Sequence, residues 1–304
     1  MGRTARLRLL RRYSPLYLML LPGLIYFVIY RYAPMFGTLI AFKEFSFMNG
    51  IWGSPWADPW YKHFQYFIDS PYFTKIMSNT ILISVYKLVW GMAPGIVFAI
   101  LLHEVRFAPF KRIVQTIAYL PHFLSWVIVY GMLLVLLSET TGLVNVWMKE
   151  HFDAAIPFLT STTWFRSVLI GSEVWKEFGW SAIIYLAAIT GIDLTLYEAA
   201  RVDGAGRLRS IWHITLPGIR NVILLLFIVR LGHILDAGFD QIYIMYNVKV
   251  YEVADILDTY VFRTGLEQFN FSLASAVGLF KSLIGLVLVI SANRMARRWG
   301  GSIW

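Results

Sequence analysis

Residues 80–102 read TILISVYKLVWGMAPGIVFAILL, a run in which Lys87 is the one ionisable side chain of the Lys, Arg, Asp or Glu type. A helix needs about 20 mostly apolar residues to cross the hydrocarbon core of a bilayer. This stretch has that length and that character. It therefore predicts a transmembrane helix, and it sets the class of fold for the chain around it.

The composition of the whole chain agrees with this stretch. Of the 304 residues, 58% are hydrophobic and 15% are charged, whereas a soluble domain is about 45–50% apolar and about 25% charged. Five further segments are long and apolar enough to be spans, at 15–35, 113–137, 168–189, 222–235 and 273–292. The predicted fold is all-α: an integral membrane helical bundle of about six transmembrane helices.

The basic residues set the expected orientation, because Lys and Arg gather in cytoplasmic loops. They crowd both terminal tails and the loops that follow the second and fourth predicted spans. The alternating loops carry mainly Asp and Glu. Both termini are therefore expected to be cytoplasmic. The net charge of +9 is then juxtamembrane, and no nucleic-acid partner is expected.

Motifs for enzyme chemistry are missing from the sequence. The chain has no Cys, so neither a disulfide nor a thiolate metal site can form. It has no Gly-Lys dipeptide and hence no phosphate-binding loop, so ATP would be hydrolysed by another chain. His103-Glu104 begins a zinc-protease pattern, but Phe107 stands at the second His position. We expect no catalytic residue, no metal site and no cofactor in this chain.

The longest loop on the predicted cytoplasmic side is residues 190–221, TGIDLTLYEAARVDGAGRLRSIWHITLPGIRN. Thr195 and Glu198 have the spacing of a capping box, which predicts a helix that starts near Leu196. Gly204 stands where a left-handed residue would close that helix. We expect an ordered, amphipathic loop with one face available to a partner.

The second half of the loop predicts another short helix. It would run from Arg207 to Ile214, and Pro217 would end it, because proline cannot donate to the helical ladder.

Three motifs in this loop resemble the EAA loop of permease subunits from binding-protein-dependent ATP-binding cassette importers: Glu198-Ala199-Ala200, Asp203-Gly204-Ala205 and Ile214-Thr215-Leu216-Pro217. Ile211 departs from the family, where an aromatic residue is common, and the neighbouring Trp212 offers one instead. The resemblance implies that the loop docks onto an ATPase. It assigns this coupling to Glu198, Ala199, Ala200, Arg201, Asp203, Gly204, Ala205, Ile214, Leu216 and Pro217.

The resemblance extends over roughly residues 70–295 and implies three parts. Residues 1–70 would be an N-terminal cytoplasmic tail, a first transmembrane helix and an aromatic outer segment. Residues 71–295 would be a permease core of five transmembrane helices with the coupling loop at 190–221, and 296–304 a cytoplasmic tail. The aromatic segment lies either along the membrane interface or at a sugar-stacking surface, and both interpretations stay open.

Terminal and internal motifs narrow the resemblance further. Pro22-Gly23, Tyr32-Ala33-Pro34-Met35 and Ser302-Ile303-Trp304 resemble permeases for oligosaccharides and polysaccharides from Gram-positive bacteria. This resemblance implies a multi-pass protein of the bacterial cytoplasmic membrane with an oligosaccharide substrate. It also implies a second homologous permease, a dimeric ABC ATPase that uses ATP and Mg, and an extracellular solute-binding lipoprotein.

Polar and aromatic residues inside the predicted spans are candidates for the substrate path, because charges in a bilayer usually face a cavity or a partner charge. These are Lys87, Trp90, Trp126, Tyr130, Glu173, Trp175, Lys176, Glu177, Trp180, Arg230 and Lys281. Mutual ion pairing and core packing are the alternative roles. The acids Glu173 and Glu177 are outnumbered by four bases. The surplus predicts either carboxylates from a partner chain or an acidic oligosaccharide, such as one derived from pectin or alginate.

Two other functions are weighed against a permease. A secondary transporter should show inverted repeats with matching broken helices, and a membrane-embedded polysaccharide enzyme needs a carboxylate or nucleotide site on a loop. The sequence shows no clear sign of either.

Overall fold

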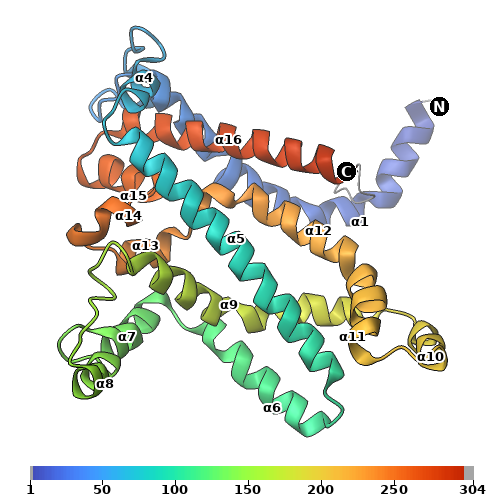
Figure 1. Ribbon diagram of the computed structural model, residues 1–304. Coiled ribbons are helices and arrows are strands. Elements are labelled where there is room, and N and C mark those ends of the chain that lie inside the picture. The colour runs from blue at the N-terminus through green and yellow to red at the C-terminus, as the bar shows by residue number, and fades with distance from the viewer. Residues whose placement is uncertain (1–2, 298–304) are drawn as a thin grey trace. The chain divides into compact units, whose positions relative to one another are not determined.

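The computed structural model describes residues 3–297, and the side chains of residues 13–294. These residues form helices, with one isolated bridge between Lys43 and Trp56 (Figure 1). The predicted all-α class is confirmed. Ser302-Ile303-Trp304 and most of the predicted tail at 296–304 lie outside the described residues.

The chain divides into two compact units. The first holds the described residues up to Asp69 together with Val261–Phe280, and the second holds Ser70–Tyr260 together with the described residues from Lys281 onward.

The first unit begins with a long helical run. Helix α1 (Arg3–Phe27) continues through a π-helical turn, η1 (Val28–Tyr32), and through α2 (Ala33–Met35) into the 3-10 helix η2 (Phe36–Phe42). Residues Tyr13–Phe42 of this run are long and apolar enough to cross a membrane. The run corresponds to the first predicted span.

The aromatic segment that follows is organised around a buried lysine. Lys43 donates from Nζ to the carbonyl oxygens of Ile51, at 2.8 Å, and Trp52, at 3.2 Å. Short helices α3 (Gly50–Gly53) and α4 (Lys62–Ile68) belong to this segment. The Trp side chains here remain exposed, which leaves both interpretations of the segment open.

The second unit is built on two long helices, α5 (Phe73–Glu104) and α9 (Phe165–Thr190), which pack against each other. Gly91 and Gly95 of α5 stand four residues apart, a spacing of small residues that favours close approach between membrane helices. A Cβ on Gly95 would collide with the Ser181 hydroxyl of α9, so this glycine does allow a close approach. Ala99, Ala182 and Tyr185 continue the same buried core.

The third predicted span, 113–137, is not one straight helix. Helix α6 (Ala108–Tyr119) passes through a 3-10 turn, η3 (Leu120–Phe123), to α7 (Trp126–Leu137), and the two helices are bent by 103°. Pro121 lies at the start of η3, and Ser125 caps α7 by accepting from the Ile128 amide. A proline and a new N-cap explain the break. Helix α8 (Leu143–Phe152) follows.

The fifth span begins earlier than expected, and the predicted stop at Pro217 is wrong. Helices α11 (Arg207–Ser210), η4 (Ile211–Thr215) and α12 (Leu216–Gly232) form one run from Arg207 to Gly232. The η4 turn is π-helical, with the Leu216 amide bonded to the Ile211 carbonyl. This wide turn lets the chain pass Pro217, which sits in the first turn of α12 where a missing N–H costs nothing.

Short helices fill the segment before the last span. They are η5 (Ile234–Asp236), α13 (Phe239–Met245), η6 (Val248–Val250), α14 (Tyr251–Ala254), α15 (Leu257–Phe262) and η7 (Arg263–Glu267). The last helix is α16 (Phe271–Arg297).

The number of spans agrees with the sequence. Within residues 3–297, four helical runs can cross a membrane by length and composition, and two bent pairs bring the total to six if each pair is one span. The second bent pair is α9 with α10 (Leu194–Val202), at 71°. The predicted bundle of about six spans is therefore confirmed.

Candidate coupling loop and charged cavity

Helix α10 is capped at both ends by local signals. The Asp193 carboxylate accepts from the Thr195 amide at 2.9 Å, so the N-cap is Asp193. The predicted capping box of Thr195 and Glu198, with a start near Leu196, is wrong by two residues, because the better acceptor stands just upstream. The helix begins at Leu194, and Glu198 has no part in its cap.

The C-terminus of α10 closes on Gly204, as predicted. Gly204 has φ +75°, and its amide bonds to the Arg201 carbonyl at 3.1 Å. The Ala205 amide bonds to the Ala200 carbonyl at 2.8 Å. These two bonds around a left-handed glycine form a Schellman motif, which fixes where α10 ends and where the chain turns back.

The outer surface of α10 is exposed, including apolar side chains. Val202 is 88% exposed, and Leu194 and Leu196 are also exposed. Glu198, Ala199, Arg201, Asp203 and Gly204 are exposed, Ala200, Ala205, Ile214 and Leu216 are half-buried, and Pro217 is exposed. The short helix thus exposes most of the EAA-type residues together with large apolar side chains, which leaves this surface free for a partner.

Two contacts join this loop to the spans. The Tyr197 hydroxyl lies 2.9 Å from the Thr215 hydroxyl in η4. The Arg207 Nε lies 4.0 Å from Glu104 Oε2 at the end of α5. A displacement of this loop would therefore act on the start of the fifth span and on the C-terminal end of α5.

A second feature is a charged cavity of about 310 Å³ within the second unit. Residues of α5, α9, α12 and η5 line it, with Gly238 and Ala237 after η5. Six of its lining residues are ionisable: Lys87, Glu173, Glu177, Arg230, His233 and Asp236. Sequence reasoning named the first four. It missed His233, which lies near the end of the fifth predicted span, and Asp236, which directly follows that span.

Lys87 is held by groups from two sides. Its Nζ lies 3.4 Å from Glu173 Oε2, and it also donates to the side-chain oxygen of Gln241. Gln241 in turn donates to the Leu169 carbonyl at 2.8 Å. The ion pair between Lys87 and Glu173 places opposite charges side by side, so the two charges offset each other.

Lys176 and Glu177 belong to an aromatic cluster. Lys176 Nζ donates to the His122 carbonyl at 2.6 Å and lies 3.2 Å from Glu177 Oε1, and its ammonium stands over the Trp126 ring at 5.6 Å. His122 bonds through Nδ1 to Glu177 at 2.8 Å and stacks on Trp180 at 4.4 Å. Lys176 thus covers a face of the Trp126 ring and His122 a face of the Trp180 ring, so these faces are not open to a sugar. Sequence reasoning missed His122, although the adjacent Pro121 marked the turn.

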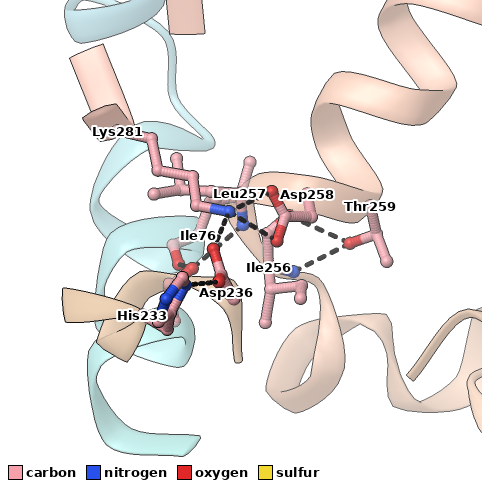
Figure 2. A network of polar contacts seen from close by, with 9 residues as sticks. Ile76, His233, Asp236, Ile256, Leu257, Asp258, Thr259 and Lys281 are labelled. Atoms are coloured by element: carbon pink, nitrogen blue, oxygen red, sulfur yellow. Dashed lines mark hydrogen bonds and ion pairs between the residues drawn. The ribbon is translucent and has the colours of Figure 1, made fainter. Parts of the chain in front are cut away.

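Lys281 contacts two carboxylates that lie outside the predicted spans and were therefore not counted among the charges within them. Its Nζ lies 2.6 Å and 2.8 Å from the two oxygens of Asp258 and 2.7 Å from Asp236 Oδ1 (Figure 2). His233 Nδ1 lies 3.0 Å from the other oxygen of Asp236. Glu173 pairs with Lys87 and Glu177 with Lys176, so mutual ion pairing, one of the roles that the sequence left open, does occur in the spans. The two acids at Lys281 belong to the short helices η5 and α15, and they lower the predicted surplus of positive charge.

Arg230 differs from these lysines in its contacts. Its guanidinium reaches α5, where a Cβ on Gly91 would lie 3.0 Å from Nη1. Among the described residues, this side chain forms neither a hydrogen bond nor an ion pair. The missing side chain of Gly91 therefore leaves room for this guanidinium.

The remaining aromatic candidates lie away from the charged cavity. Trp175 lines a separate, apolar cavity of about 320 Å³ between α7 and α9. Tyr130 packs against a buried apolar cluster, and Trp90 is exposed. Among the described residues, no three His, Asp or Glu side chains come together as a metal site.

Comparisons with known proteins agree on one class of protein. Residues 91–300 match the family model described as binding-protein-dependent transport system inner membrane component. A polygalacturonan/rhamnogalacturonan transport system permease protein, YteP of Bacillus subtilis, is 47% identical over 285 residues, which cover 94% of this chain and 88% of that protein. Protein LplB of the same organism is 43% identical over 290 residues, with 95% and 91% covered.

Solved structures give the same answer. A chain in the crystal structure of a bacterial ABC transporter that imports the acidic polysaccharide alginate matches with a TM-score of 0.89 and 40% identity, over 97% of this chain and 99% of that one. A second structure of a bacterial alginate ABC transporter, in complex with a periplasmic protein bound to alginate pentasaccharide, matches with a TM-score of 0.88.

Proposed function

The chain belongs to the binding-protein-dependent transport system inner membrane component family, and we propose that it is a permease subunit that imports acidic oligosaccharides built from uronic acids. It acts in an ATP-binding cassette importer of the bacterial cytoplasmic membrane. The importer contains a second homologous permease, a dimeric ATPase and an extracellular solute-binding lipoprotein. ATP and Mg bind to the ATPase, and this chain contributes the path and the coupling loop.

The observation that carries the coupling role is the geometry of α10. The helix is capped at both ends, its apolar side chains are exposed, and Tyr197 ties it to the start of the fifth span. A rigid exposed helix can move with an ATPase subunit without unfolding. The residues assigned to this contact are those of the EAA-type loop, with Glu198 exposed and free of a capping role.

Movement of α10 would reach the charged cavity through the spans that line it. Tyr197 passes displacement to η4 and α12, which carries Arg230. Arg207 and Glu104 connect the loop to α5, which carries Lys87. Rocking of these helices would open the cavity to either side in turn, and ATP hydrolysis in the partner would drive the cycle.

The substrate class is supported by the relatives. YteP is named for polygalacturonan and rhamnogalacturonan transport, and the solved transporters are named for alginate. All these polymers contain uronic acids, whose carboxylates give a substrate negative charge. A cavity that combines basic and acidic side chains suits an anionic, hydroxyl-rich ligand.

Neither alternative accounts for these observations. A secondary transporter has no need for an exposed coupling helix that docks onto an ATPase. YteP and the alginate transporter chain, both matched over most of their length, carry permease or transporter names rather than enzyme names.

Transport by the assembled complex tests the proposal. The permease pair, the ATPase and the binding protein are reconstituted in proteoliposomes, and ATP hydrolysis is measured with oligogalacturonates, oligoalginates and their carboxyl-reduced neutral counterparts. Uronate oligomers are expected to stimulate hydrolysis and to enter the vesicles. Equal stimulation by the neutral oligomers would contradict the acidic substrate, and failure of the ATPase to co-purify would contradict the permease role.

A further inference from the structure

We propose that Arg230 is the residue of this permease that recognises a substrate carboxylate in the charged cavity. The inference rests on the proposed function and assigns the charge specificity to one side chain. On the sequence alone Arg230 and Lys281 are both candidates for the substrate path, and their contacts in the structure distinguish them.

The charges of the cavity wall support this choice. Each lining carboxylate has a basic partner: Glu173 lies beside Lys87, and Glu177 beside Lys176. Asp236 lies 2.7 Å from Lys281. After these pairs are formed, Arg230 is the cation of the wall that has no hydrogen bond or ion pair within the described residues.

The basic residues that were rival candidates are already saturated. Lys281 contacts both oxygens of Asp258 as well as Asp236 (Figure 2). Lys87 is enclosed by Glu173, Gln241 and the close approach of Gly238. A substrate anion would have to displace protein carboxylates from these ammonium groups, whereas at Arg230 it would displace none.

The position of Arg230 leaves its guanidinium available. It lies in the last turn of α12 and reaches across to Gly91 of α5, whose missing side chain leaves the space that the guanidinium uses. Burying a lone charge is costly unless a counter-charge meets it. The geometry is therefore suited to an anion that arrives and leaves.

The chemistry of the group matches a uronate. A guanidinium is planar and offers parallel N–H donors that fit the two oxygens of a carboxylate, and one such bond is stronger than a neutral hydrogen bond. A sugar hydroxyl would gain less. Arg230 thus favours an oligomer that carries carboxylates over a neutral oligomer of the same length.

The test uses the complete transporter with the binding protein held constant. Uptake of oligogalacturonate and of its methyl-esterified form is measured for wild type, Arg230→Gln, Arg230→Lys and Gly91→Ala. Because only the permease changes, the affinity of the binding protein cancels in the ratio of each variant to wild type. Lys149→Gln is the control for loss of one positive charge, because Lys149 is an exposed residue of α8 that does not line the cavity.

Arg230→Gln is expected to lower uronate uptake at sub-saturating concentration by about tenfold to a hundredfold, the loss that corresponds to one hydrogen bond to a charged group. Uptake of the ester should fall much less. Uronate uptake by Arg230→Lys should lie between that of wild type and that of Arg230→Gln, because lysine keeps the positive charge but lacks the parallel N–H donors of the guanidinium. Gly91→Ala, which crowds the guanidinium, should raise the half-saturating uronate concentration severalfold, and Lys149→Gln should match wild type.

Three outcomes overturn the inference. An unchanged uronate-to-ester ratio in Arg230→Gln shows that the residue does not sense the carboxylate. A second outcome is that purified Arg230→Gln complexes lose the second permease while Gly91→Ala keeps normal selectivity. This result shows that the counter-charge of Arg230 is a carboxylate of the second permease. A wild-type complex that ignores uronates contradicts the proposed function itself, and the inference falls with it.

Discussion

The Tyr197 hydroxyl of α10 lies 2.9 Å from the Thr215 hydroxyl of η4. Thr215 is buried, and it belongs to the π-helical turn through which the fifth span begins. The bond therefore connects an exposed helix, which the proposed function places against the ATPase, to a transmembrane helix that lines the charged cavity. It is a short mechanical link between the two proposed sites.

Tyr197→Phe should weaken coupling without preventing assembly. The variant loses a hydrogen bond of about 1 kcal/mol net and leaves the Thr215 hydroxyl without this partner. We expect less sugar transported per ATP hydrolysed, measured in proteoliposomes. Thr190→Val is the control, because the Thr190 hydroxyl bonds to Ala187 of its own helix. An unchanged transport ratio in Tyr197→Phe would show that the bond carries no motion.

Gly204→Ala isolates the cost of a backbone conformation. The residue has φ +75°, and a Cβ there would meet no atom within 4 Å, so packing does not contribute. A left-handed non-glycine residue costs roughly 1–2 kcal/mol, which we expect to loosen the end of α10 and reduce sugar-stimulated ATP hydrolysis. Glu198→Lys should also reduce it, by reversing an exposed charge at the proposed interface.

The matched control for Gly204→Ala is Gly206→Ala. Gly206 has φ −75°, and its Cβ would also stand in open space, so this variant should hydrolyse ATP as wild type does. Full coupling in both Gly204→Ala and Glu198→Lys would contradict the role of the loop.

Lys281→Met should destabilise the protein. The Lys281 side chain is 18% exposed, and its ammonium balances two carboxylates, Asp236 and Asp258. Removal of one partner from a buried ion pair lowers the free energy of unfolding by about 3–5 kcal/mol. Because Lys281 is partly exposed, we expect a loss at or below the lower end of this range. We expect a lower melting temperature of the purified complex, with partial recovery in Lys281→Met combined with Asp258→Asn. A selective loss of uronate transport at unchanged stability would favour Lys281 over Arg230 as the substrate contact.

The sequence predicts well what depends on local composition. The spans follow from apolar length, and Gly204 follows from the conformational freedom of glycine. The start of α10 could not be fixed in the same way, because Asp193 and Thr195 are both good caps and only the folded loop decides between them. The helix end predicted at Pro217 was wrong because a π-helical turn precedes this proline and lets the helix continue, and such a turn has no clear sequence signal.

The charge balance could not be predicted for another reason. Asp236 and Asp258 lie outside the apolar runs, so a count of charges within spans omits them, yet folding brings both to Lys281. The availability of Arg230 is likewise a property of the tertiary structure. It depends on which acids the other cations have already bound.

The orientation of the chain is the last prediction, and the absence of Cys makes it directly testable. We expect the coupling loop to be cytoplasmic and the segment between the last two spans to be extracellular, because basic residues gather in the former and acids in the latter. A Cys at Gly206 should be protected from an impermeant thiol reagent in intact cells and should react after permeabilisation. Asn247 lies in that outer segment, but its side chain bonds to the Leu159 carbonyl and to the Lys249 amide, so a Cys there would break both bonds. Val248, which is 81% exposed, is the better outer site, and a Cys there should react in intact cells. Labelling of Gly206→Cys from outside would reverse the orientation and remove the loop from the ATPase side.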